Sequence, residues 1–338
     1  MRKLIMALIA LCLVCCVGWT VDVQPSALLP GIAVIRATPV AHIPLTDMQS
    51  TLPWWDTIFD ASGNMCCYTE EVSWEIDGID TAMGGGPLWN LRVLDLRSGK
   101  LVTKSLVPKE FLTSCDLAVS HDGKTISFSS LDRTDGLYSL WKTDWSGAKP
   151  VRLSLPRMNI NSSTWRPDDR VIACLSTTRT SMDHSDLTIF LIDLNRPGTV
   201  LEKHQIDGDF CGIRYSPDGR WLACRNLNDL AIIDTKTWRV YTIFAPRLLT
   251  LTISPDANDP SLANYEWLPD SQSLLATISY QLPEKTDHYQ IYRVPLTGQA
   301  TYLADGNIFN RSPDGRSLYL HQGGKDWRLD LTMPQNAK

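Results

Sequence analysis

The segment Ile213-Arg-Tyr-Ser-Pro-Asp-Gly-Arg-Trp-Leu-Ala-Cys224 decides the fold of this chain. An apolar stretch ends in Ser-Pro-Asp-Gly, and a second apolar stretch follows at once. Proline fixes φ at the turn, aspartate caps it through its side chain, and glycine takes the left-handed position. The segment therefore predicts a β-hairpin.

The hairpin motif recurs along the chain, which is typical of repeat architectures. Five more copies turn at equivalent positions, four clear and one weaker near residue 63. The six turn positions are Gly63, Gly123, Asp169, Gly219, Ser271 and Gly315. Two copies replace glycine, and aspartate tolerates the left-handed conformation better than serine.

A third strand and a short fourth strand follow most copies. Examples are Leu230-Ala-Ile-Ile-Asp-Thr-Lys-Thr237 as a third strand and Ala300-Thr-Tyr-Leu303 as a fourth. Four short antiparallel strands in a unit of about fifty residues form a propeller blade. The sequence thus predicts an all-β fold, a six-bladed β-propeller of four-stranded antiparallel blades. The last blade lacks a fourth strand, and Ile32-Ala-Val-Ile35 is expected to supply it and close the ring.

The repeated Ser-Pro-Asp-Gly-Arg/Lys hairpin, with its Ile-Tyr-x-Val-type third strand, resembles the TolB-type, WD-repeat-like propeller family over residues 52–331. The resemblance implies the fold and says little of function, because propellers serve many unrelated functions. TolB carries a separate α/β domain before its propeller, whereas only about thirty residues separate the expected signal from the first blade here. The resemblance is therefore to the propeller part alone.

We divide the chain into a signal peptide or anchor (1–18), an N-terminal segment (19–51), the propeller (52–331) and a tail (332–338). Arg2 and Lys3 precede an uncharged apolar run, Leu4 to Val17, which is typical of a secretory signal. Two outcomes stay open: cleavage near Gly18 or Thr20, or an uncleaved membrane anchor. Export to the periplasm or the exterior is expected in both cases.

The composition of the chain indicates which classes of partner and cofactor are not expected. The net charge is −5, so nucleic acid is not an expected partner. The cysteine and histidine spacings match no zinc site, and no metal or cofactor is expected. Of the six cysteines after the signal, Cys174 and Cys224 sit at apolar strand positions and are expected to be buried, while disulfide pairing stays open.

The long connections between strands two and three all fall on one face of the propeller, which we call the loop face, and the hairpin turns fall on the opposite turn face. Function tends to reside on such loops. We therefore expect a binding surface there, formed by residues of the connections 70–90, 177–186 and 281–288: Trp74, Glu75, Asp77, Trp89, Arg179, His184 and His288. Arg214, Glu266 and Arg311 lie on innermost strands and are expected either to reach the central channel or to pair with one another.

No catalytic residue is assigned, because no nucleophile, base or G-x-S-x-G motif can be identified. His121 stands at the proline position of its turn and is expected to be exposed and structural. The leading hypothesis is an exported, non-catalytic module that binds a protein or cell-envelope component. The alternative is a carbohydrate-active lyase or glycoside hydrolase acting on a glycan, with His184, His288 and His321 meeting over the channel.

Overall fold

The computed structural model describes twelve stretches of the chain: residues 25–40, 57–73, 88–98, 100–103, 112–132, 137–156, 158–179, 185–208, 210–225, 229–249, 260–283 and 287–333. The expected signal segment, Trp74, Glu75, Asp77 and His184 lie outside them. The side chains of Trp89 and Arg179 are also outside the description. Within the described residues, no helix has the length and hydropathy needed to cross a membrane.

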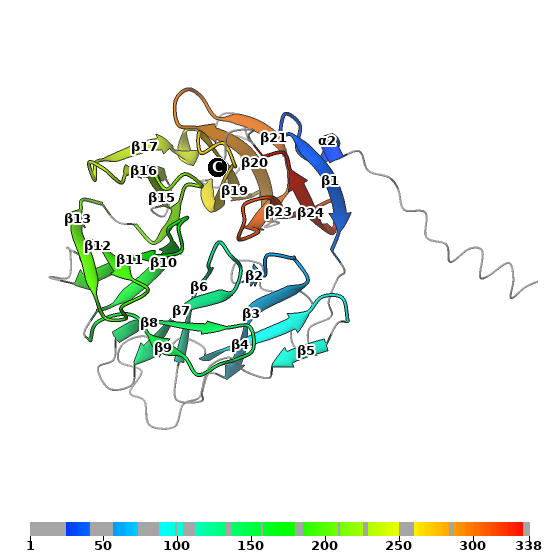
Figure 1. Ribbon diagram of the computed structural model, residues 1–338. Coiled ribbons are helices and arrows are strands. Elements are labelled where there is room, and N and C mark those ends of the chain that lie inside the picture. The colour runs from blue at the N-terminus through cyan, green and yellow to red at the C-terminus, as the bar shows by residue number, and fades with distance from the viewer. Residues whose placement is uncertain are drawn as a thin grey trace, which may run out of the picture.

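Six four-stranded antiparallel sheets stand around a central axis, as Figure 1 shows. The all-β, six-bladed propeller is therefore confirmed. The strands of blades 1 to 3 are β2 (Thr57–Phe59), β3 (Met65–Ser73), β4 (Leu88–Asp95) and β5 (Lys100–Thr103); β6 (Leu112–Val119), β7 (Thr125–Asp132), β8 (Leu137–Asp144) and β9 (Val151–Arg152); and β10 (Ile160–Trp165), β11 (Val171–Arg179), β12 (Ser185–Asp193) and β13 (Val200–Ile206).

Blades 4 to 6 follow the same order from the inner strand outward. Their strands are β14 (Gly212–Tyr215), β15 (Trp221–Arg225), β16 (Leu230–Asp234) and β17 (Val240–Phe244); β18 (Ser261–Trp267), β19 (Ser273–Gln281), β20 (Asp287–Pro295) and β21 (Thr301–Asp305); and β22 (Asn307–Arg311), β23 (Ser317–Gln322) and β24 (Lys325–Leu331). A short 3-10 helix, η3 (Pro246–Leu249), follows β17.

The N-terminal segment closes the ring. The short helix α2 (Pro25–Leu28) leads to β1 (Val34–Pro39), which pairs antiparallel with β24 as the outermost strand of blade 6. The closing strand was expected at Ile32–Ile35 and lies slightly later. Leu28 and Leu29 are buried with blade 5 and blade 6 side chains, including Leu275 and Leu318. Burying such leucines removes apolar surface from water, so this segment is part of the core.

All six turn positions have the left-handed backbone that the motif predicts. The φ angles are 66° at Gly63, 71° at Gly123, 72° at Gly219 and 71° at Gly315, and 53° and 54° at the two substituted positions, Asp169 and Ser271. A side chain at Gly123 would meet the Ala61 backbone of the neighbouring blade, with Cβ 2.8 Å from the Ala61 nitrogen. The turns of adjacent blades therefore touch on the turn face.

Both non-glycine residues use their side chains to join neighbouring turns. The Asp169 carboxylate accepts the backbone N–H groups of His121 (2.8 Å) and Asp122 (2.9 Å), one blade away. The Ser271 hydroxyl accepts the backbone N–H of Asp218 at 3.1 Å. Left-handed backbone is costly for residues with a Cβ, and these hydrogen bonds between blades offset that cost.

The inner edge of each blade poses a physical problem, because it presents backbone groups with no neighbouring strand. Side chains of the adjacent blade satisfy them. Ser162 and Thr164 accept the N–H groups of Ile213 (3.2 Å) and Tyr215 (3.1 Å), and Trp267 Nε1 donates to the Arg214 carbonyl at 3.0 Å. Asn310 Nδ2 likewise donates to the Thr57 carbonyl. These bonds hold the inner strands, and hence their channel-facing side chains, in fixed positions.

Candidate functional site: the central channel

A cavity of about 690 Å³ runs along the axis of the propeller. The inner strands of all six blades line this cavity. One lining residue from each, in blade order, is Ile58, Ala118, Ser163, Arg214, Glu266 and Arg311. Its loop-face end is lined by residues at or near strand starts, among them Tyr138, Tyr289 and Asn307, while His121 and Pro313 lie at the turn-face end. The volume is in the range of small-molecule sites.

The lining of this cavity is cationic although the chain is acidic. Among its described residues are three arginines, Arg214, Arg225 and Arg311, and a single carboxylate, Glu266, so the formal sum is 3 − 1 = +2. The whole chain carries −5. A positive charge on the described lining, opposite in sign to the whole chain, favours anions at this part of the channel.

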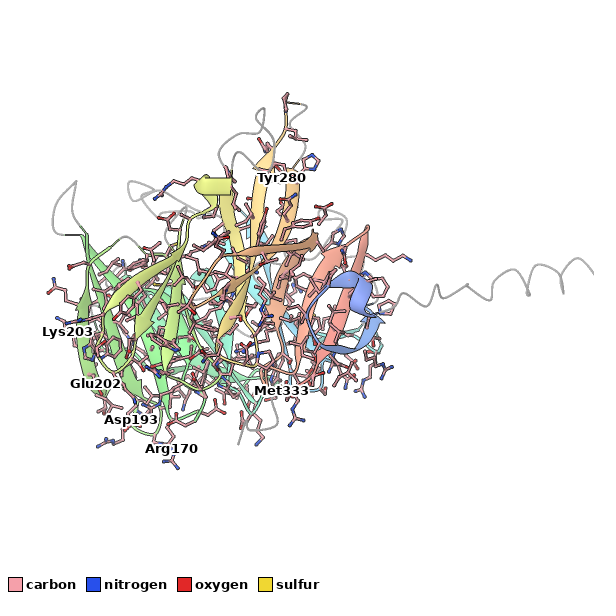
Figure 2. All side chains as sticks on the ribbon, turned by 90° about the horizontal axis from the view of Figure 1, so that it is seen from above. Arg170, Asp193, Glu202, Lys203, Tyr280 and Met333 are labelled. Atoms are coloured by element: carbon pink, nitrogen blue, oxygen red, sulfur yellow. The ribbon has the colours of Figure 1, made fainter. Side chains whose placement is uncertain are left out.

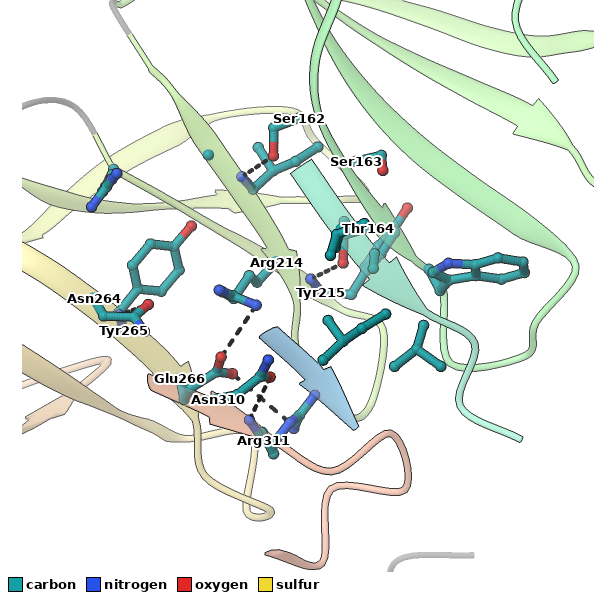
Figure 3. Close-up of a pocket in the computed structure, with 18 of the residues that line it drawn as sticks. Ser162, Ser163, Thr164, Arg214, Tyr215, Asn264, Tyr265, Glu266, Asn310 and Arg311 are labelled. Carbon is teal, nitrogen blue, oxygen red and sulfur yellow. Dashed lines mark hydrogen bonds and ion pairs between the residues drawn. The ribbon is translucent and has the colours of Figure 1, made fainter. Parts of the chain in front are cut away.

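Arg214, Glu266 and Arg311 form a cluster that we call the arginine–glutamate cluster (Figure 3). Arg214 Nη1 lies 3.2 Å from Glu266 Oε1, and Arg311 Nε lies 4.0 Å from Glu266 Oε2. The exposed fractions of the three side chains are 38%, 3% and 12%. Both parts of the sequence expectation are thus confirmed: the three residues reach the channel and pair with one another.

Local packing fixes the accessible guanidinium of the cluster. Arg214 lies over the Tyr265 ring, with its Cζ 5.7 Å from the ring centroid, and its carbonyl is held by Trp267. Burial, with the nearby Arg214 charge in the same direction, lowers the pKa of Arg311, and the Glu266 carboxylate opposes this change. Two guanidinium groups therefore share one buried carboxylate.

His121 was expected to be exposed, and that expectation is wrong. Its side chain is 23% exposed and lines the cavity, because Asp169 of the next blade draws it inward through Nδ1 at 3.2 Å. Burial and the Arg311 charge lower the pKa of His121, and Asp169 raises it by less. The sequence feature that indicates this contact is Asp169 at a glycine position. Its effect on His121 can be recognised only when the turns of adjacent blades are known to touch.

Three of the residues expected in loops lie within strands instead. Trp89 pairs with Glu71, Arg179 with Ser185, and His288 with Tyr280. The connections are shorter at both ends than expected, because polar residues at strand ends resemble loop sequence. The connections that remain between the strands are residues 74–87, 180–184 and 282–286.

His288 lies in β20 at the loop-face end of blade 5. Its ring stacks on Tyr280, with the centroids 5.4 Å apart, and both side chains are partly exposed. Figure 2 shows Tyr280 at the end of the molecule opposite Arg170 and Asp193, as expected for loop and turn faces. Neither His288 nor His321 is among the described residues that line the cavity. His321 Nδ1 lies 2.8 Å from Asp326 Oδ1. The described histidines of the alternative hypothesis therefore do not meet in the channel.

Five cysteine side chains and no cluster of metal-ligating side chains are found in the described part of the chain. No group of three or more His, Cys, Asp or Glu side chains there could hold a metal ion. Cys66, Cys67, Cys174, Cys211 and Cys224 are free thiols, and Cys174 and Cys224 are buried as expected. Only Cys211 among these five is exposed, at the loop-face end of the cavity.

The fold and the channel define this chain as a six-bladed β-propeller with a polar axial cavity whose described lining is cationic. It is similar to the putative TolB of Agrobacterium tumefaciens (16% identity, 82% of this chain and 90% of that chain, TM-score 0.50) and to the hydrazine synthase of Kuenenia stuttgartiensis (14%, 83% and 77%, 0.50). Oligogalacturonate lyase from Vibrio parahaemolyticus aligns with a TM-score of 0.48 at 12% identity, over 86% of this chain and 75% of that chain.

No protein-family model and no curated protein match the chain. At these identities the likeness shows a shared fold. The expected resemblance to TolB-type propellers is therefore confirmed for the architecture.

Proposed function

We propose that this chain is an exported, non-catalytic propeller that binds a protein or cell-envelope component on its loop face, around the mouth of the channel. The observation that carries the proposal is the height of blade 5 beside that mouth. Strands β19 and β20 have nine residues each, whereas β15 and β16 of blade 4 have five each. The blade 5 hairpin thus stands above its neighbour and presents Tyr280 and His288, while Tyr289 lines the cavity next to them.

The chemistry of this surface supports binding. Tyrosine and histidine both offer an apolar ring with a polar tip, and tyrosine is enriched at interfaces. Gln281 Nε2 donates to Asp287 at 2.6 Å across the two strands, which fixes the end of the hairpin. A partner that meets a rigid surface loses less conformational entropy on binding. Trp74, Glu75, Asp77, Trp89, Arg179 and His184 remain proposed members of the same surface.

The test is affinity capture and cross-linking from an envelope extract, using the chain from Trp19 onward as bait. Tyr280→Ala/His288→Ala is the test variant on the loop face, and Arg170→Ala, on the exposed turn face, is its matched control. A specific partner should be recovered by the parent and by Arg170→Ala and lost by the double variant. Equal recovery by all three proteins would refute the loop-face site.

A lyase acting on a glycan is the second candidate, supported by the His121–Asp169 pair at the channel. A histidine with a lowered pKa is neutral near pH 7 and able to accept a proton, and Arg311 lies close enough to affect its pKa. A glycoside hydrolase is less well supported, because it needs two carboxyl groups and the described lining offers Glu266 alone. Turnover of acidic oligosaccharides that is abolished by His121→Gln would favour the lyase.

A further inference from the structure

We propose that the channel is also a binding site for a small, polar organic acid, whose carboxylate docks on Arg214 within the arginine–glutamate cluster. This site lies below the loop-face surface and does not depend on the partner proposed above.

The first argument is the charge of the cluster. Among the described residues, the two guanidinium groups and the Glu266 carboxylate sum to 2 − 1 = +1, with Glu266 and Arg311 almost wholly buried, and the charge of Asp314 also acts on Arg311. A positive charge held beside buried groups favours an anion as the ligand. An anion would offset this positive charge, and the hydroxyl and amide groups of the cavity wall favour an organic acid over inorganic phosphate.

The second argument is how incompletely Glu266 satisfies its partners. Arg311 Nη1 and Glu266 Oε1 are both buried without a hydrogen-bond partner among the described residues, so the two ion pairs leave one donor and one acceptor unsatisfied. The Glu266 carboxylate, which is 3.2 Å from Arg214 and 4.0 Å from Arg311, is the only described acid on the wall of the cavity. Arginine binds carboxylates through paired N–H donors, and the more exposed Arg214 side chain is the one that a ligand can reach.

The third argument is the rest of the cavity wall. Around the cluster it carries hydroxyl and amide side chains, such as Ser163, Thr164, Asn264 and Asn307. Asn307 Oδ1 is buried and, within the described part of the chain, has no hydrogen-bond donor. Such a wall suits a ligand with several hydroxyl or amine groups better than a fatty acid. The cavity volume of about 690 Å³ admits a molecule of drug size.

The experiment measures binding to the purified chain by calorimetry, with gluconate as the polar acid. Sorbitol, which lacks the carboxylate, and hexanoate, which lacks the hydroxyl groups, are matched controls, and inorganic phosphate tests the other common oxyanion. Gluconate should bind at least tenfold more tightly than each of the three. No gluconate binding, or equal binding of phosphate or sorbitol, would overturn the proposal.

Two substitutions should change the affinity for gluconate in opposite directions. Arg214→Gln removes a charged hydrogen-bond donor and should weaken binding by about tenfold or more. Glu266→Gln removes the competing carboxylate and should tighten binding by about threefold or more, since a unit charge several ångströms away is lost. Misfolding would weaken binding in both variants and would also change the circular dichroism spectrum. Weaker binding in both variants with an unchanged spectrum would therefore refute the assignment. Failure here leaves the loop-face capture experiment untouched, because that experiment varies Tyr280 and His288.

Discussion

Asp169 stands where four of the six blades have glycine. Replacing it with glycine tests whether backbone strain at the turn or the hydrogen bonds between blades contribute more to stability. By the motif alone, Asp169→Gly restores the preferred residue and relieves a φ of 53°. That relief is worth about 1 kcal/mol. Glycine also gives the unfolded chain more freedom, which costs a similar amount, roughly 0.5–1 kcal/mol.

The structure adds a larger opposing contribution. The Asp169 carboxylate, 25% exposed, accepts two backbone N–H groups of blade 2 at 2.8 and 2.9 Å. Hydrogen bonds to a charged group contribute about 1.5–3 kcal/mol each, and partial exposure favours the lower value. Losing both costs about 3 kcal/mol. We therefore expect Asp169→Gly to lower the free energy of unfolding by about 2–3 kcal/mol.

Ser271→Gly is the matched control. Its φ is 54°, but it accepts one backbone N–H at 3.1 Å through a neutral hydroxyl. Relief of strain, added unfolded-state entropy and the loss of about 1 kcal/mol nearly cancel, so its stability should change by less than about 1 kcal/mol. Urea denaturation at constant m-value measures both variants. An Asp169→Gly protein as stable as Ser271→Gly would refute the role of the hydrogen bonds between blades.

Three further predictions concern other parts of the molecule. Because burial lowers the folded-state pKa of His121 below its unfolded value of about 6.5, protonation favours the unfolded chain; stability should fall as the pH drops below about 6.5, and His121→Gln should flatten that pH dependence in urea titrations. Leu29→Ala, at a fully buried site, should cost about 2–5 kcal/mol, whereas Ile35→Ser, 68% exposed on β1, should cost less than about 0.5 kcal/mol; equal losses in thermal denaturation would contradict the docking of the N-terminal segment. Iodoacetamide should label Cys211 in the native protein and Cys66 only after unfolding, because burial raises the pKa of the Cys66 thiol to about 12; mass spectrometry of the labelled peptides decides this.

The sequence was sufficient for the architecture. Each hairpin depends on residues adjacent in the chain, so Ser216-Pro-Asp-Gly219 and its relatives indicate where the inner strands end and turn. Six copies of that local signal, spaced by about fifty residues, lead to six blades. The left-handed backbone at Asp169 and Ser271 followed from the same alignment of copies.

Strand ends at the loop face were harder to predict. Arg179 and His288 are polar and lie where strands leave the core, so sequence cannot distinguish a solvated strand end from a loop. The placement of His121 failed for a related reason. Its environment depends on Asp169, which is 48 residues away, and on the contact between two turns.

The sequence by itself determined the repeat, the turns and the arginines and glutamate of the inner strands. Only the tertiary structure decided that Arg214 and Arg311 share one carboxylate, since these residues come from three different blades. Ring closure brings them together. Local propensity acts within a few residues of the chain, while the charge of a cavity depends on every strand that lines it.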